Sequence, residues 1–440
     1  MINRQEKWRQ QLHLEPPQGW LNDPNGLCFF GGFYHVYFQY APDNADGSTL
    51  KCWGHYQSPD LLNWEFTGTV IFPDCPDDKD GVYSGSAIVC DDTLHLFYTG
   101  NVKEDGLHDY VQSGRGANVI HVSTKDGITI SPKQTVLRNS DYPACCSCHV
   151  RDPKVWYENG KWQMVLGART RKDEGCVLFY SSDDLSHWTY EQMDQIPDFG
   201  YMWECPDVFS IDGHRYLSVS PQGLPHQELC FQNVYQSGYF LYDRNLTSFT
   251  EWDMGFDFYA PQTFEAPDGR RILIGWMGIG DIPYFNPTTE LGFQHCLTLP
   301  REITRDTDGL LRQNPIRELQ TLRKEHSRLK DGSCTQLTLP FELTAEIHQE
   351  FSLTLNDACE LSWQNGLFHL TFLEEAIGGG RTVRASALPY CTSLRLIADK
   401  SSIELYLNDG RQVFSSRIYP DSNTMNVSLQ GLSADSYLFS

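Results

Sequence analysis

The chain has 440 residues, of which 34 are Lys or Arg and 57 are Asp or Glu, so its formal net charge is −23. This charge repels nucleic-acid phosphates and anionic membrane surfaces, so we expect neither as a partner and favour a small, neutral or weakly charged substrate. Because a single hydrophobic core usually stops growing below this length, the sequence predicts two domains.

Residues 1–8 contain no apolar stretch of the kind that an export signal needs. No uninterrupted apolar run approaches the roughly 20 residues of a membrane-spanning helix. We therefore expect a cytoplasmic protein in which the 14 scattered cysteines are reduced.

Up to about residue 310, short alternating segments are separated by Gly, Asn and Asp turns. Segments 35–38, 94–98 and 163–166 are examples, and long helical patterns are nearly absent. A period of two residues is typical of strands, so this part is predicted to be all-β.

Two series of motifs recur along these strands. One series follows strand-like runs and begins at Asp60, Asp126, Asp184 and Asp243. The other marks the start of each unit, at residues 22–25, 83–86, 151–154, 204–207 and 259–262, spaced 55 to 68 residues apart. Units of this length have room for four strands, which predicts a five-bladed β-propeller over residues 1–312; a β-sandwich with coincidental spacing is the alternative.

Beyond the repeats, residues 314–329 predict a helix, because Pro315 stands near its first turn and Ile316, Leu319 and Leu322 are three apart. We expect a helical linker over residues 313–332. Alternation then resumes and ends in the turn Asn408-Asp409-Gly410, which predicts a β-sandwich over residues 333–440.

Three of the five unit starts carry a carboxylate, namely Asp23, Asp152 and Glu204. The first strand of each propeller blade lines the central channel, so these groups should converge. Cleavage of an acetal needs a proton donor and a carboxylate that attacks carbon or activates water, and this set supplies both. Taken singly, each carboxylate could equally be a turn or surface residue. Arg151 either contacts a substrate or forms a structural ion pair with Asp152.

Residues 20–26, Trp-Leu-Asn-Asp-Pro-Asn-Gly, resemble the sucrose-binding motif of glycoside hydrolase family 32, the invertase and fructanase group. Residues 151–155 and 204–207 resemble the other two signatures of that family. Further similar segments are 38–40, 53–55, 83–86, 299–302 and 404–410.

The resemblance implies a five-bladed propeller, a C-terminal β-sandwich and a retaining β-fructofuranosidase that acts on sucrose and short fructo-oligosaccharides. In this reading Asp23 is the nucleophile, Glu204 the general acid/base and Asp152 the transition-state stabiliser. The residues that would bind the sugar are Asn22, Gln39, Trp53, Tyr83, Ser84 and Arg151. Two rival readings are a non-catalytic carbohydrate-binding propeller and an inverting glycosidase that cleaves arabinosyl or xylosyl bonds.

Within the family, sucrose 6-phosphate is the alternative substrate, because residues 98–103 are similar to a segment of bacterial sucrose-6-phosphate hydrolases. Arg115, Lys154, Arg169 and Arg171 are the candidates for binding its phosphate. The sequence leaves the choice between monomer and homo-oligomer open.

No metal or organic cofactor is expected, because protonation activates the leaving group. The cluster Cys145-Cys146-Ser147-Cys148-His149 lacks a second ligand pair at zinc-site spacing. Its oxidation is a hypothetical route to inhibition, tested by assaying activity before and after mild peroxide and reductant.

Overall fold

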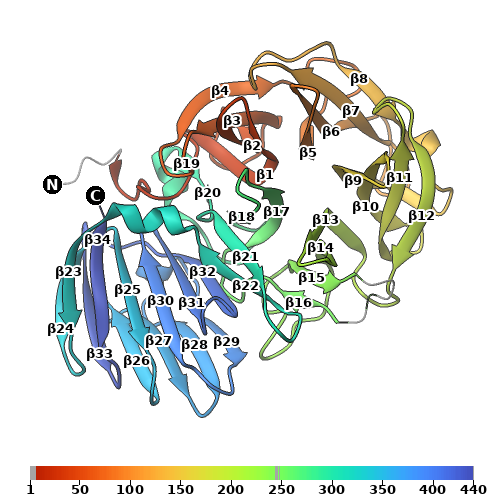
Figure 1. The fold of residues 1–440 in the computed structure, drawn as a ribbon. Helices are drawn as coiled ribbons and strands as arrows, with labels where there is room; N and C mark the ends of the chain where they lie inside the picture. Colours follow the sequence, from red (N-terminus) through yellow and green to blue (C-terminus); the bar gives the residue numbers. More distant parts are fainter. Residues whose placement is uncertain (1–5, 243–245, 247, 440) are drawn as a thin grey trace.

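A computed structural model describes residues 6–242, 246 and 248–439 of the chain. Nearly every regular element within these ranges is a strand. The strands form a ring of sheets, and a two-sheet sandwich packs against the side of the ring (Figure 1). The predicted fold class, a propeller followed by a sandwich, is confirmed. Within the described ranges, no helix has the length and apolar character to cross a membrane.

Five sheets, counted among the described residues, surround the central channel. The first contains β19 (Phe293–Gln294), β1 (Gly19–Phe30), β2 (Phe33–Ala41), β3 (Cys52–Ser58) and β4 (Glu65–Ile71). The second contains β5 (Val82–Cys90), β6 (Thr93–Lys103), β7 (Arg115–Thr124) and β8 (Gln134–Leu137). The third contains β9 (Cys146–Glu158), β10 (Lys161–Thr170), β11 (Gly175–Ser182) and β12 (Thr189–Gln195).

The fourth sheet contains β13 (Met202–Ile211), β14 (His214–Gln222), β15 (Gly238–Leu241) and β16 (Thr250–Glu251). The fifth contains β17 (Tyr259–Glu265), β18 (Arg271–Met277), β20 (Cys296–Leu297), β21 (Arg301–Arg305) and β22 (Leu311–Pro315). Because β19 pairs in parallel with β1, a strand from late in the ring lies beside the first strand and closes the circle.

The first strand of every ring sheet breaks its pairing register at the corresponding place. The breaks lie at Leu21/Pro24, Val82/Gly85, Arg151/Lys154, Glu204/Asp207 and Tyr259/Gln262. Four of them contain Pro, which has no N–H for the ladder and is tolerated where pairing is interrupted. Asp152 and Cys205 adopt positive φ angles of 63° and 47° there. Such irregularities re-aim side chains, and in this ring they do so at equivalent points of all five sheets.

The other repeated motif makes the turn between the third and fourth strands. One carboxylate oxygen of Asp60 accepts the backbone N–H groups of Leu62 and Asn63, at 3.0 and 2.8 Å. Asp126 and Asp184 cap their turns in the same way. The sequence repeat therefore reflects a repeated side-chain cap. The fourth motif begins at residues 243–245, which lie outside the described residues.

The sandwich consists of two six-stranded sheets. One contains β23 (Arg323–Leu329), β34 (Ala434–Phe439), β25 (Phe341–Glu346), β30 (Ser393–Ala398), β31 (Ser402–Leu407) and β32 (Gln412–Arg417). The other contains β24 (Cys334–Thr338), β33 (Thr424–Gln430), β26 (Phe351–Leu355), β27 (Cys359–Gln364), β28 (Leu367–Phe372) and β29 (Val383–Ala387). Alternate apolar residues such as Leu343, Leu353 and Leu405 fill the space between the sheets. The short helical elements are α1 (Glu375–Gly378), η2 (Asn139–Asp141), η3 (Pro287–Leu291) and η4 (Arg317–Leu322).

The helix predicted over residues 314–329, and with it the helical linker 313–332, is wrong. Leu311–Pro315 is a strand of the fifth sheet, Arg317–Leu322 is a 3₁₀ turn, and Arg323–Leu329 is a strand of the sandwich. Residues three apart share a face of a 3₁₀ helix, which explains why Ile316 and Leu319 are buried without an α-helix. The strand after it lies at the sheet edge with five consecutive exposed residues, so it lacks the alternation of buried and exposed residues that would have marked it as a strand.

A buried charge network joins the ring to the sandwich. Arg301 donates to Glu404 through Nε and Nη2, at 3.0 and 2.7 Å, and to Asp253 at 3.1 Å. His13 bridges Asp399 and Glu404, with ring nitrogens 2.8 and 2.9 Å from their carboxylate oxygens. Burial alone lowers the pKa of His13, but the two carboxylates outweigh it and raise that pKa to about 9. His13 is therefore the cation that neutralises this end of the network.

We expect His13→Gln to lower the free energy of unfolding by about 3 kcal/mol at pH 7, because it leaves the buried carboxylate of Asp399 without its cation. Since folding raises the pKa of His13, its contribution is complete below pH 6.5, the ordinary value, and is lost as pH rises through about 9. Urea unfolding between pH 6 and 10 should show this loss in the wild type and not in the variant.

The matched control is His326→Gln, which removes an exposed histidine that lies 2.9 Å from Asp435. This exposed pair should contribute less than about 1 kcal/mol. Equal losses in the two variants would contradict the assigned role of His13.

Candidate active site

The five register breaks supply much of the lining of one pocket, whose volume is about 330 Å³. Each break contributes the two residues that precede its Pro or Gly: Asn22 and Asp23, Tyr83 and Ser84, Arg151 and Asp152, Glu204 and Cys205, Tyr259 and Ala260. The repeated backbone irregularity therefore brings side chains from all five sheets to one place. The three carboxylates at the unit starts lie together as the sequence predicted.

Glu204 is held by donors on both of its oxygens. Arg151 donates to Oε1 through Nε and Nη2, at 3.1 and 2.7 Å. Gln222 and Tyr259 donate to Oε2, at 2.7 and 2.6 Å. The Tyr259 hydroxyl also lies 3.3 Å from the carbonyl oxygen of Ser220, which gives its hydrogen a second acceptor. Glu204 is thus fixed in orientation from three sides.

Asp23 and Asp152 are more deeply buried, each only 5% exposed. Burial raises the pKa of Asp23 to about 7; a hydrogen bond from Ser84 opposes this rise, and the charge of Asp152 adds to it. Burial likewise raises the pKa of Asp152 to about 6, against the opposing effect of Arg151. Two neighbouring carboxyl groups with raised pKa values in one cavity are typical of an acid–base site.

Cys205 lies between these two carboxylates. Its backbone N–H donates to Asp152 at 2.9 Å, and its Sγ lies 3.6 Å from Asp152 and 3.9 Å from Asp23. Burial, followed by the nearby carboxylates, raises the pKa of the thiol well above its usual value. Cys205 therefore stays protonated and can donate a weak hydrogen bond, so it does more than fill space.

Of the six residues predicted to bind the sugar, five line the pocket: Asn22, Gln39, Tyr83, Ser84 and Arg151. Trp53 does not. It is fully buried, and its indole N–H donates to the carbonyl oxygen of Tyr83 at 3.0 Å. The expectation of direct contact is wrong in this arrangement, because Trp53 supports the lining from behind. Arg151 lies nearer to Glu204, at 2.7 Å, than to Asp152, at 4.0 Å, so its main ion pair is with Glu204.

The pocket also contains residues that the sequence did not single out as binding residues. Besides Cys205 and Ala260, they are Trp20, Lys51, His149, Gln222, Tyr235, Tyr259, Trp276, Gly280 and Asp281. Four of these are aromatic, and such rings give a sugar flat apolar faces with polar edges. Trp20 and Tyr259 stand inside quoted motifs, so their repeat positions could have identified them. Gln222, Tyr235 and Trp276 lie outside every motif and carry no comparable signal.

The four candidate phosphate-binding cations do not share one location. Arg115 lines the pocket. Lys154 is tied to Asp207 and to the carbonyl oxygen of Thr263, Arg169 pairs with Asp173, and Arg171 donates to backbone carbonyls of Ala144 and Gln112. Arg115 therefore adds its positive charge to those of Lys51 and Arg151 in the lining.

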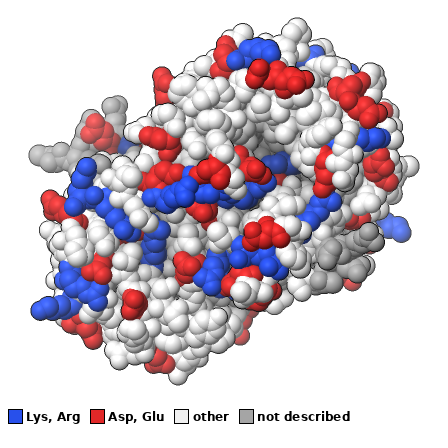
Figure 2. Space-filling model, in the orientation of Figure 1, with Lys and Arg blue, Asp and Glu red and all other residues white. Residues whose placement is uncertain are grey.

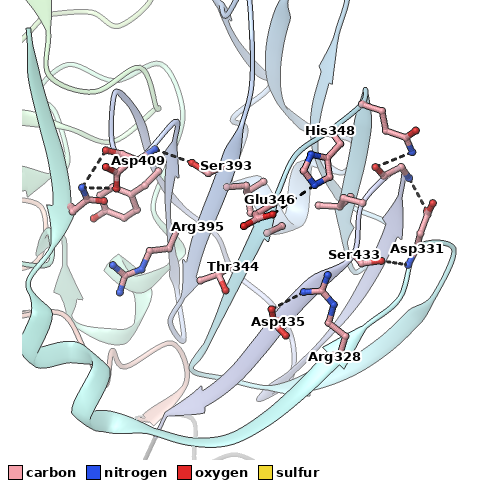
Figure 3. A pocket seen from close by; sticks show the side chains of 17 residues that line it. Arg328, Asp331, Thr344, Glu346, His348, Ser393, Arg395, Asp409, Ser433 and Asp435 are labelled. Atoms are coloured by element: carbon pink, nitrogen blue, oxygen red, sulfur yellow. Dashed lines mark hydrogen bonds and ion pairs between the residues drawn. The ribbon is translucent and has the colours of Figure 1, made fainter. Parts of the chain in front are cut away.

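A larger cavity of about 900 Å³ lies on the sandwich, over β25, β30 and β34 (Figure 3). Its charged groups largely satisfy one another: Arg328 pairs with Asp435 at 2.6 Å and His348 with Glu346 at 3.7 Å. Tyr406, almost fully buried, is the one Phe, Tyr or Trp in its lining as far as the described residues go. The cavity offers no stacking face and no convergent acids, so the ring pocket is the candidate active site.

The net negative charge does not form one acidic field on the face seen in Figure 2. Lys and Arg side chains form a band along the junction of ring and sandwich, intermixed with Asp and Glu. Local charge at the pocket, rather than the total of −23, therefore decides which ligands are attracted.

Comparison with protein families gives two matches that together span almost the whole chain. The profile described as "Glycosyl hydrolases family 32 N-terminal domain" matches residues 13–315. The profile described as "Glycosyl hydrolases family 32 C terminal" matches residues 311–436.

Similar proteins agree with these profiles. The chain is 39% identical to a sucrose-6-phosphate hydrolase of Bacillus subtilis, over 95% of this chain and 90% of that protein. It is 35% identical to a raffinose invertase of Escherichia coli, over 99% of this chain and 94% of that protein. Among solved structures, a Bombyx mori β-fructofuranosidase of the same family superposes with a TM-score of 0.87 at 30% identity, covering 100% of this chain and 95% of that one.

Proposed function

Because the chain belongs to glycoside hydrolase family 32 and is a glycosidase, we propose that it releases terminal β-D-fructofuranosyl residues from sucrose and short fructo-oligosaccharides with retention of configuration. One observation carries the proposal: Asp23, Asp152 and Glu204, from three different sheets, line a single pocket at equivalent strand irregularities. A carbohydrate-binding module would need the aromatic rings but not three buried or half-buried acids.

The chemistry proceeds in two displacements. Ionised Asp23 attacks C2 of the fructosyl unit while Glu204 gives its proton to the glycosidic oxygen, so the C2–O bond breaks and the alcohol leaves. Glu204 then takes a proton from water, whose oxygen attacks C2 and releases Asp23. Two inversions at C2 leave the configuration unchanged.

Tyr259 suits an acid/base that changes its protonation state. Its hydroxyl donates to the ionised Oε2 of Glu204. When Glu204 carries the proton, the same hydroxyl can accept from it and turn its own hydrogen to the carbonyl oxygen of Ser220. Asp152, buried beside Arg151, is positioned to stabilise the positive charge that develops on the fructosyl ring.

The test is the anomeric form of a transfer product. Sucrose should be hydrolysed in water containing methanol, and NMR should identify methyl β-D-fructofuranoside as the first methyl glycoside formed. The α-anomer would indicate inversion and would overturn the mechanism, and absence of any hydrolysis of sucrose, kestose or inulin would overturn the activity.

Sucrose 6-phosphate is a second candidate substrate, favoured by the positions of Arg115 and Lys51 in the pocket lining. A charge-assisted hydrogen bond to phosphate contributes about 1.5–3 kcal/mol, so Arg115→Gln should lower kcat/KM on sucrose 6-phosphate by ~10-fold or more. On sucrose the same change should cost less than about 3-fold. Arg169→Gln, outside the lining, is the control. Equal losses on both substrates would contradict phosphate binding by Arg115.

The pH dependence should show an acidic limb near neutrality. Since the nucleophile must be ionised, activity should fall as pH drops through the raised pKa of Asp23, about 7, and that of Asp152, about 6. The two groups are close enough for the limb to belong to the pair. Measurement of kcat/KM between pH 4 and 9 checks this, and a limb near pH 4 would contradict it.

A further inference from the structure

His149 connects the candidate acid/base to a loop at the pocket. Its Nδ1 lies 2.5 Å from Nη1 of Arg151, the guanidinium nitrogen that does not bind Glu204. Its Nε2 lies 3.0 Å from the carbonyl oxygen of Tyr110, in the segment between β6 and β7. Hydrogen bonds therefore link Tyr110, His149, Arg151 and Glu204 in one continuous chain.

The partners determine which proton the imidazole carries. The Tyr110 carbonyl can only accept a hydrogen bond, so Nε2 must carry a hydrogen. Arg151 can only donate, so Nδ1 must be unprotonated. Burial and the charges of Arg151, Arg115 and Arg169 lower the pKa of His149 to about 3. The imidazole of His149 thus stays neutral, in this one tautomer, over the pH range in which the enzyme is assayed. It donates a hydrogen bond through Nε2 and accepts one through Nδ1.

The Tyr110 carbonyl is itself fixed. It accepts a second hydrogen bond, at 3.2 Å, from Nε of Arg115, the cation in the pocket lining. The Asp109 carboxylate accepts the backbone N–H groups of residues 111, 112 and 113, at 3.0, 2.8 and 3.2 Å. The N–H of Cys148, one residue before His149, donates to the carbonyl oxygen of Val111 at 2.7 Å. The loop and the start of β9 therefore form one hydrogen-bonded unit.

We propose that His149 is a positioning residue, which ties the orientation of Arg151, and through it Glu204, to the Tyr110 carbonyl that Arg115 also binds. Arg115, proposed to bind the leaving part of sucrose 6-phosphate, and Glu204, proposed to protonate that leaving group, are then joined by one chain of hydrogen bonds. This inference rests on the proposed function, because it takes Glu204 to be the acid/base.

Two variants separate positioning from simple packing. His149→Ala removes both hydrogen bonds, whereas His149→Gln keeps them, because an amide oxygen can accept from Arg151 and an amide N–H can donate to Tyr110. We expect His149→Ala to lower kcat on sucrose ~10- to 100-fold with KM changed less than about 3-fold, a part of what general acid catalysis supplies. His149→Gln should stay within about 3-fold of the wild type.

The leaving group supplies the decisive readout. On 4-nitrophenyl β-D-fructofuranoside, whose leaving group departs without a proton, release of nitrophenol in the first turnover should slow less than about 3-fold in His149→Ala.

The matched control is His121→Gln. His121 is a half-buried histidine of the propeller whose side chain contacts His95 and does not line the pocket. It should leave kcat on both substrates unchanged, and thermal unfolding of all variants should show that they fold. Unchanged kcat in His149→Ala, or equal losses on the two substrates, would overturn the inference while the wild type remains a fructosidase. An inactive wild type would instead remove the proposed function, and the inference with it.

Discussion

Replacing Asp23 by Asn should lower kcat on sucrose by ~10⁴-fold or more, because the amide cannot attack C2 and no other carboxylate of the pocket stands at the same irregularity of the first sheet. Sucrose binding should survive, since the aromatic rings and the remaining polar lining are unchanged. Initial rates and calorimetric titration measure the two effects. Asp46→Asn, at an exposed turn, is the control and should be fully active. A variant that retains more than a few per cent of the activity would exclude Asp23 as nucleophile.

The same substitution should make the protein more stable above neutral pH. Folding raises the pKa of Asp23 from 3.8 to about 7. The contribution of Asp23 to the free energy of unfolding therefore falls as pH rises from 3.8 to about 7, because the buried carboxyl group is less easily ionised than the same group in the unfolded chain. At pH 8 the buried charge costs about 1–4 kcal/mol, which Asn removes. Thermal unfolding should therefore show a higher Tm for the variant at pH 8 and little difference at pH 4.

Glu204→Gln should lower kcat on sucrose by ~10³-fold, because Gln cannot protonate the glycosidic oxygen. The amide can keep a hydrogen bond with Arg151, so the pocket should retain its shape. On 4-nitrophenyl β-D-fructofuranoside, release of nitrophenol in the first turnover should be nearly normal and turnover should then stall, because no base activates water.

Azide distinguishes this role from that of Asp23. As a nucleophile that needs no base, azide should restore turnover of the nitrophenyl substrate in Glu204→Gln and yield fructosyl azide, whereas Asp23→Asn should not respond. Equal losses on both substrates without an azide effect would contradict the acid/base assignment.

The catalytic candidates could be found from sequence because they occur in local repeats. The register breaks that hold Asp23, Asp152 and Glu204 are encoded within a few residues, and Pro marks each of them. Trp53 belongs to neither repeat and was placed at the site only by the resemblance of segment 53–55 to the family; the packing of β3 shows that its ring lies behind Tyr83. Gln222 and Trp276 reach the pocket through tertiary structure alone.

The boundary between the domains was harder to predict. A spacing of three residues at Ile316, Leu319 and Leu322 fits both an α-helix and a 3₁₀ turn, and only burial on one side of a single turn distinguishes them. The following strand is an edge with polar residues on both faces, so its pairing with β34, more than 100 residues later in the chain, leaves no trace in local periodicity.

The buried network at the junction also dictates an order of events during synthesis. His13 lies 386 and 391 residues before its partners Asp399 and Glu404. At about 5–20 residues per second, the ribosome delivers those partners roughly 20 to 80 s after His13. Throughout that interval the N-terminal segment has no sandwich to dock on, and the ring lacks its flanking support. The nascent chain therefore completes this junction only after Asp399 and Glu404 have left the ribosome and can reach His13.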